Sequence, residues 1–182
     1  MERILALDFE TADHRPDSAC AIGLALVEGD AVEAVESHLI RPPYDAGPDD
    51  DFDFTFTWVH GITWARVAAA PDFRRLWRSI RSRFHGVGFL AAHNAGFDRG
   101  VLAACCRAHG IEAPSQPFVC TMRLAREVWG IRPTRLPDVC RRLGIRLGRH
   151  HDAAADAEAC ARIMIAAAAA GWRPGGNSTA SR

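Results

Sequence analysis

The sequence predicts an α/β fold, and three observations indicate it. Residues 4–9 are apolar on both faces until their end, which is typical of a buried central strand. Two further β-like runs, 19–27 and 31–40, are joined by the turn sequence Glu28-Gly29-Asp30. From residue 71 onward, helical periodicity alternates with short apolar runs. We therefore expect a three-stranded start followed by alternating strands and helices.

The remaining elements follow in order along the chain. A stretch rich in Pro, Gly and Asp at 41–57 predicts a long loop. After it we expect helices at 71–84, 97–109, 122–129, 136–143 and 153–170, and short strands at 89–92 and 118–121. Asp152 is the expected N-cap of the last helix, and Gly171 is its expected stop signal.

Length and composition predict one domain in a reducing compartment. The chain has 182 residues, of which 48% are apolar, enough for a sizeable core. We expect the domain to span residues 1–172, with a flexible Gly/Ser/Pro-rich tail at 173–182. The six cysteines form no Cys-x-x-Cys pair and are expected to be reduced core residues. With neither a signal peptide nor a membrane span in its pattern, the protein is expected to be cytoplasmic and to have no membrane partner.

The charge balance excludes a global basic field. Lys and Arg number 22, as do Asp and Glu, so the net charge is zero. A polyanionic substrate must then be held by local contacts. Two arginine clusters could supply them, although solvated helix faces are the simpler interpretation. These clusters are Arg74, Arg75, Arg78, Arg81 and Arg83, and Arg141, Arg142, Arg146 and Arg149.

Two carboxylates end the first predicted strand. Asp8 and Glu10 lie on the same side and Phe9 on the other, because successive side chains of a strand alternate between its faces. Neighbouring carboxylates repel, and a cation between them removes that cost. Hard oxygen ligands favour Mg²⁺ or Mn²⁺ over zinc. An isolated Asp-x-Glu is nevertheless more often a strand end with solvated acids.

Three further residues complete a candidate metal-dependent phosphodiesterase site. Asp98 is a third acid after a short apolar strand, although by itself it could be a helix cap. His151 is expected in the loop before the last helix and Asp156 in that helix's second turn, so that one faces a water and the other a metal. His150 is chemically near-equal to His151, and the five-residue offset from Asp156 favours His151.

With these motifs the sequence resembles the DEDDh 3′-to-5′ exonucleases, the DnaQ-like group that includes the proofreading subunits of bacterial DNA polymerase III. The family's three motifs occur in the family order as Asp8-Phe9-Glu10, Asn94 to Asp98, and His151 to Asp156. The segment His60-Gly61-Ile62-Thr63 agrees as well. The resemblance covers most of the chain.

The resemblance implies a ribonuclease H-like fold, a mixed five-stranded sheet flanked by helices, with the acids at one edge of the sheet. It implies two divalent cations, Mg²⁺ or Mn²⁺, and it makes His151 the general base. The metal ligands that it implies are Asp8, Glu10, Asp98 and Asp156. The substrate-binding residues that it implies are Thr11, His60 and Phe97.

The leading functional prediction is a 3′-5′ exonuclease that removes nucleoside 5′-monophosphates from the 3′ end of single-stranded or frayed DNA. The alternative is 3′ trimming of RNA or short oligoribonucleotides, because sugar discrimination rests on contacts to the 2′-hydroxyl. A non-catalytic nucleic-acid-binding module is a remote alternative, since all five catalytic positions carry competent residues. A polymerase partner is left open. The acidic stretch Asp49-Asp50-Asp51-Phe52-Asp53-Phe54 matches no family motif, and we favour a solvated loop.

Overall fold

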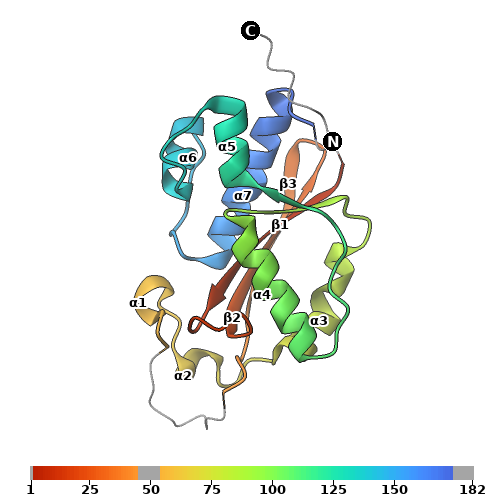
Figure 1. The fold of residues 1–182 in the computed structure, drawn as a ribbon, viewed down its shortest axis with the longest axis vertical. Coiled ribbons are helices and arrows are strands. Elements are labelled where there is room, and N and C mark those ends of the chain that lie inside the picture. Colours follow the sequence, from red (N-terminus) through yellow and green to blue (C-terminus); the bar gives the residue numbers. More distant parts are fainter. Residues whose placement is uncertain (1, 45–53, 174–182) are drawn as a thin grey trace.

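The centre of the molecule is a five-stranded sheet in the order β3-β2-β1-β4-β5 (Figure 1). The computed structural model describes residues 2–44 and 54–173. The acidic residues 49–53 and the tail from 174 to 182 lie outside the described residues. The strands are β1 (Ile4–Thr11), β2 (Ala19–Glu28), β3 (Ala31–Leu39), β4 (Phe89–Ala92) and β5 (Phe118–Cys120).

The sheet is mixed, as predicted. β1 pairs antiparallel with β2 and parallel with β4, β2 pairs antiparallel with β3, and β4 pairs parallel with β5. The turn between β2 and β3 has Gly29 at φ +63°, a conformation that glycine adopts without steric cost. β1 therefore occupies the central position expected of an apolar strand.

The helices match the expected pattern except at two places: the end of the helix expected at 71–84, and the segment that follows the loop expected at 41–57. They are α1 (Thr57–His60), α2 (Trp64–Val67), α3 (Phe73–Ile80), α4 (Ala95–Ala108), α5 (Thr121–Trp129), α6 (Leu136–Leu143) and α7 (Ala153–Ala169). The helix expected at 71–84 is shorter, because its last turn, Arg81–Phe84, is 3₁₀. α4 begins two residues earlier than expected. α1 and α2 were not predicted, since four residues are too few to show a period. Among the described helices, none is long and apolar enough to span a membrane.

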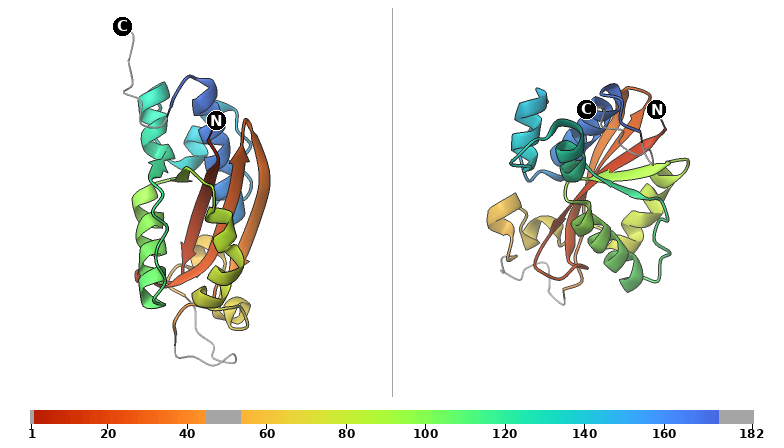
Figure 2. Two further views of the ribbon diagram at one scale, coloured as in Figure 1. Left: turned by 90° about the vertical axis from the view of Figure 1, so that its right-hand side faces the viewer. Right: turned by 45° about the horizontal axis from the view of Figure 1, so that its top comes forward.

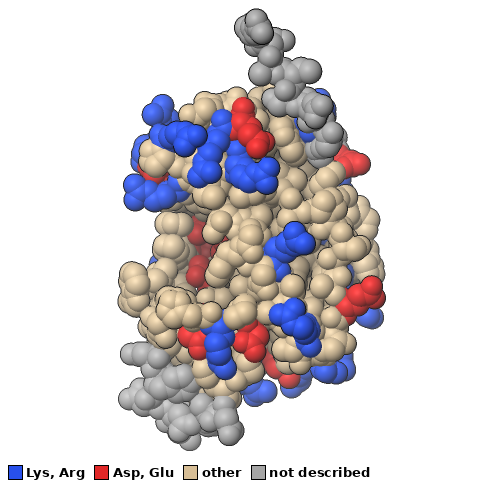
Figure 3. Space-filling model, viewed as in Figure 1, with Lys and Arg blue, Asp and Glu red and all other residues tan. Residues whose placement is uncertain are grey.

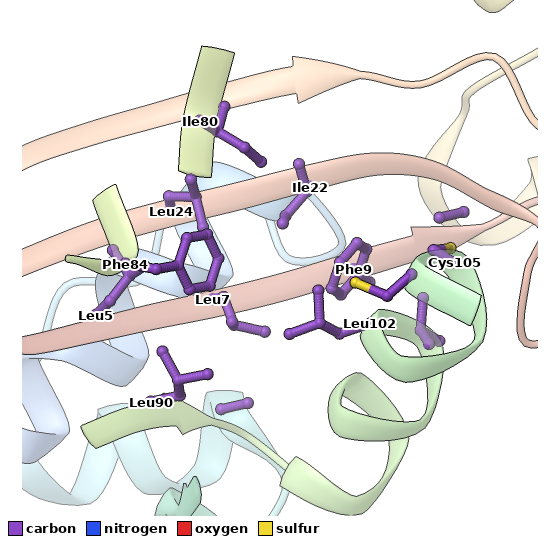
Figure 4. Close-up of a cluster of buried hydrophobic side chains, with 14 of the residues drawn as sticks. Leu5, Leu7, Phe9, Ile22, Leu24, Ile80, Phe84, Leu90, Leu102 and Cys105 are labelled. Atoms are coloured by element: carbon purple, nitrogen blue, oxygen red, sulfur yellow. The ribbon is translucent and has the colours of Figure 1, made fainter. Parts of the chain in front are cut away.

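The two faces of the sheet bury two apolar clusters. Leu5, Leu7 and Phe9 of β1 point into a cluster with α3 and α4 (Figure 4). Ile4 and Ala6 point the opposite way, into a cluster with α5, α6 and α7. Figure 2 shows these two groups of helices on either side of the strands. The strand's alternation thus directs the two residues that continue the second row, Asp8 and Glu10, toward α7.

The start of α7 packs directly against β2. Gly23 of β2 is paired with Asp8, and a Cβ atom at Gly23 would lie 1.8 Å from the carbonyl oxygen of Ala153. Only a glycine leaves room for this approach. Asp152 caps the helix by accepting a hydrogen bond from the backbone N–H of Ala155, as the sequence predicted. The first turn of α7 is therefore placed beside Asp8.

Candidate active site

Three carboxylates from two elements converge at the C-terminal end of β1. Asp8 and Glu10 come from β1 and Asp156 comes from α7, and one carboxylate oxygen of each lies within 4.8 Å of the others. Asp156 is in the first turn of α7, earlier than the second turn that we expected. The acids gather at the end of the central strand rather than at a lateral edge of the sheet.

Asp98 is fixed to the strand between the two acids of β1. It lies in the first turn of α4 and is 1% exposed. Its Oδ1 accepts a hydrogen bond of 3.0 Å from the backbone N–H of Phe9. Asn94, at φ +66°, turns the chain from β4 into α4, a left-handed conformation that asparagine tolerates better than most residues. The structure therefore brings all four predicted acids into one region.

The acids suppress each other's ionisation in the metal-free protein. Burial raises the pKa of Asp8 well above its usual value, and the charges of the other acids add to the effect. Burial, followed by Asp156 and Asp98, raises the pKa of Glu10 to about 8. Burial also raises the pKa of Asp98 to about 7. Four buried carboxylates cannot all be charged at neutral pH without a compensating cation.

The same cluster has the donor set of a divalent-cation site. Asp98 Oδ2 and Asp156 Oδ1 are buried and accept no hydrogen bond from any described residue. A buried acceptor without a partner is unusual and costly. A hard divalent cation would satisfy such oxygens, and carboxylates are the ligands that Mg²⁺ and Mn²⁺ prefer. The residues therefore fit the cations that the sequence predicted.

The two neighbouring histidines contact the site differently. Nδ1 of His150 lies 2.9 Å from Asp156 Oδ2, and the backbone N–H of His151 donates to the same oxygen at 3.1 Å. The two rings stack with centroids 3.9 Å apart, and His151 has φ +64°. Burial, followed by the neighbouring His150, lowers the pKa of His151, so its imidazole is neutral near pH 7. Its ring has no hydrogen-bond partner among the described residues.

The predicted substrate-binding residues line one cleft of about 1280 Å³ together with Asp8, Glu10 and Asp156. Phe97 is 46% exposed there. His60 is 4% exposed, and both ring nitrogens are engaged: Nδ1 accepts from the N–H of Ile62 at 2.9 Å, and Nε2 donates to the carbonyl oxygen of Thr11 at 3.1 Å. His60 is therefore a buried wall residue that ties its loop to the end of β1. Burial also lowers the pKa of His60.

The opposite wall of the cleft carries arginines that the sequence analysis did not single out. They are Arg126 in α5 and Arg132 and Arg135 in the connection to α6. In Figure 3, acidic atoms lie in a hollow, and arginine atoms gather above it over α5 and α6. The arginines of the two predicted clusters are all described, and none of them is among the residues that line this cleft. Arg74, Arg78 and Arg81, for example, border a separate cavity of about 600 Å³.

Comparisons with known proteins agree with this geometry. A family model described as exonuclease matches residues 5–164. Exonuclease X, solved in complex with 5′ overhanging duplex DNA, is 25% identical, with a TM-score of 0.71 and coverage of 93% of this chain and 94% of its own. A second solved structure, a full-length 3′-exonuclease, has a TM-score of 0.78 at 16% identity, with coverage of 93% of this chain and 61% of its own.

Two curated relatives are much longer than this chain. A Mycobacterium tuberculosis (strain CDC 1551 / Oshkosh) protein bearing the name of a bifunctional exonuclease/endonuclease is 32% identical over 173 residues, covering 89% of this chain and 26% of its own length. The PolC-type DNA polymerase III of Oceanobacillus iheyensis is 32% identical over 167 residues, covering 90% of this chain and 11% of its own length. The chain thus corresponds to a minor part of each.

Fold and site together define a ribonuclease H-like nuclease. The match over residues 5–164 places the chain in the exonuclease family, within its DnaQ-like group. The predicted fold class and the predicted family are both confirmed.

Proposed function

We propose that the protein is a 3′-5′ exonuclease that releases nucleoside 5′-monophosphates from the 3′ end of single-stranded or frayed DNA. One observation carries the proposal. Asp8, Glu10 and Asp156 converge within 4.8 Å in a cleft, beside the buried Asp98 and a histidine whose ring is free to act on a substrate. This arrangement suits metal-assisted hydrolysis of a phosphodiester.

The residues of the chain divide the chemistry between them. His151 takes a proton from the attacking water, since it lines the cleft and its ring has no hydrogen-bond partner among the described residues. Asp156 holds the histidine loop in place through its hydrogen bonds to the N–H of His151 and to His150. Phe97 offers an exposed ring on which a terminal base can stack. We assign the backbone N–H of Thr11, which lines the cleft, to the 3′-hydroxyl.

Asp8, Glu10, Asp98 and Asp156 would hold two divalent cations, Mg²⁺ or Mn²⁺. When bound, these cations supply Lewis-acid stabilisation of the charge that develops on the phosphodiester and its leaving oxygen. The two buried oxygens without hydrogen-bond donors support this assignment, because they call for a ligand that the chain itself does not provide.

DNA is the substrate that we favour. The solved relative with 25% identity over nearly its whole length is described as a complex with 5′ overhanging duplex DNA, and a 3′ end lies at such a junction. The PolC-type relatives carry a similar segment within a polymerase, which accords with action on 3′ ends in proofreading or repair. We do not assign a polymerase partner to this chain. A cytoplasmic location accords with its six free thiols.

RNA trimming is the second candidate. A solved 3′-exonuclease with a TM-score of 0.75 is described as recognising a histone mRNA stem-loop, so the fold accommodates RNA in at least that protein. The metal chemistry does not depend on the sugar, and discrimination rests on contacts to the 2′-hydroxyl.

The test is degradation of a single-stranded DNA and a matching RNA, each labelled at its 5′ end. Mg²⁺, Mn²⁺ and a chelator are compared, with Asp8→Ala as the control protein. We expect a metal-dependent ladder that shortens from the 3′ end of the DNA and is absent with Asp8→Ala, which removes a cation ligand. Preference for the RNA would replace the DNA assignment with the second candidate. Metal-independent cleavage, or cleavage by Asp8→Ala, would contradict the proposed mechanism.

A further inference from the structure

The α5–α6 side of the cleft presents positive charge that the hydrolytic residues do not use. Three arginines line it, and we call them the arginine wall: Arg126, Arg132 and Arg135. Arg135 is paired with Asp138 at 3.2 Å, and Arg126 donates to the neutral hydroxyl of Thr134 at 2.8 Å. Arg132 is exposed and has neither a hydrogen bond nor an ion pair with any residue that the structure describes. Its charge is therefore available to a ligand.

The loop that carries Arg132 is fastened to the rest of the site. Thr134 is 8% exposed and lies two residues after Arg132. Its carbonyl oxygen accepts a hydrogen bond of 2.8 Å from Nε2 of His93, and its hydroxyl accepts the bond from Arg126. His93 also lies 2.9 Å from the hydroxyl of Thr121 at the start of α5. The loop is thus joined both to the end of β4 and to α5, so the backbone that carries Arg132 is held in place before any ligand arrives.

A polynucleotide needs such a charge here. The net charge of the chain is zero, so no general field attracts a polyanion. Four acids with two divalent cations would be close to neutral in sum, which leaves nothing to hold the phosphates that flank the scissile one. Phosphate contacts provide most of the affinity of proteins for nucleic acid. The arginine wall is the basic part of the same cleft.

We propose that Arg132 binds a phosphate of the substrate strand next to the scissile phosphate, so that the cleft selects polynucleotides over mononucleotide esters. That the ligand is a nucleic-acid strand rests on the proposed function. The further step is that Arg132 is the residue that recognises this strand. Arg126 and His93 are positioning residues, because they act by holding the loop of Arg132.

The first test is binding of a fluorescent single-stranded oligonucleotide in Ca²⁺, followed by anisotropy. The variants are Arg132→Gln, Arg132→Lys and the matched control Arg123→Gln. Arg123 lies on α5 with its side chain 73% exposed, lies 3.7 Å from Glu127, and does not border the cleft. We expect Arg132→Gln to raise the Kd about tenfold and to lower the slope of log Kd against log salt by about 0.7, the value for one single-strand phosphate contact. Arg132→Lys keeps the charge and should stay within about twofold of wild type.

The second test is hydrolysis of the oligonucleotide and of the p-nitrophenyl ester of thymidine 5′-monophosphate. We expect Arg132→Gln to raise KM for the oligonucleotide only, with kcat and the ester rate unchanged, because the ester has no flanking phosphate. Equal binding by wild type and Arg132→Gln, or an equal loss with Arg123→Gln, would overturn the inference. A wild-type protein that binds as expected but cleaves neither substrate would overturn the proposed function and leave the assignment of Arg132 standing.

Discussion

The adjacent histidines His150 and His151 differ in what their rings contact. Both histidines line the cleft, but His150 uses its Nδ1 on Asp156, while His151 is hydrogen-bonded to Asp156 only through its backbone, and its ring has no hydrogen-bond partner among the described residues. A general base needs a ring nitrogen that is free to accept the proton. We therefore expect His151→Ala to lower the single-turnover rate by about 10²–10⁴-fold, the usual contribution of a general base, and His150→Ala to lower it by about tenfold or less.

Rapid-quench measurement of the first nucleotide released checks this prediction. His150→Gln is a useful control, since its amide can still donate to Asp156 and should keep the helix start in place. If His150→Ala proved the more damaging change, the two residues would exchange roles, and the orientation of Asp156 would have to be reconsidered.

Among the secondary-structure elements, the approach of α7 to β2 decides whether the site exists. Gly23→Ala would place a Cβ atom 1.8 Å from the carbonyl oxygen of Ala153, a backbone atom that cannot rotate away. The start of α7 would have to shift, taking Asp156 away from Asp8, which is paired with Gly23. We expect at least a hundredfold loss of exonuclease rate together with a lower Tm.

Gly100→Ala is the matched control for this change. Gly100 lies within α4, and a Cβ atom there would meet nothing within 4 Å. Replacing a glycine inside a helix by alanine stabilises it by about 1 kcal/mol, so this variant should melt higher and cleave at the wild-type rate. Rates measured on the two variants together separate a site-specific shift from a general sensitivity to alanine. Full activity in Gly23→Ala would mean that α7 tolerates displacement from the sheet.

The same elements explain what the sequence could predict. Strand alternation placed Asp8 and Glu10 on one face, and capping chemistry placed the start of α7 at Asp152, because both rules depend on neighbours in the chain. The close approach at Gly23 and the arginine wall depend on contacts between distant segments, for which one sequence carries no signal. His60 was assigned from a motif to the substrate pocket, and the structure adds that both its ring nitrogens are engaged within the protein.

Across the whole molecule, the acid cluster links folding stability to pH and to divalent cations. The pKa of Glu10 is raised from 4.5 to about 8 in the folded metal-free protein, mainly by burial. A folded-state pKa above the unfolded one means that the folded state binds more protons between these two values. Stability from this group is therefore fully present below about pH 4.5 and is lost as the pH rises through about 8. Asp98, with its pKa raised from 3.8 to about 7, acts in the same direction.

Divalent cations should reverse this loss, because they bind the deprotonated carboxylates that are costly in their absence. At an Mg²⁺ concentration about 100 times Kd, binding to the folded state adds about 2.7 kcal/mol, which corresponds to a Tm increase of about 5–10 °C for a domain of this size. We expect that increase near pH 8 and little or none near pH 5, where protons compete for the same oxygens. Thermal melts in Mg²⁺ and in chelator across this range measure the difference, with Asp8→Ala as the protein in which the Mg²⁺ effect should largely disappear. An increase that is the same at every pH, or that persists in Asp8→Ala, would place the stabilising cation somewhere other than the acid cluster.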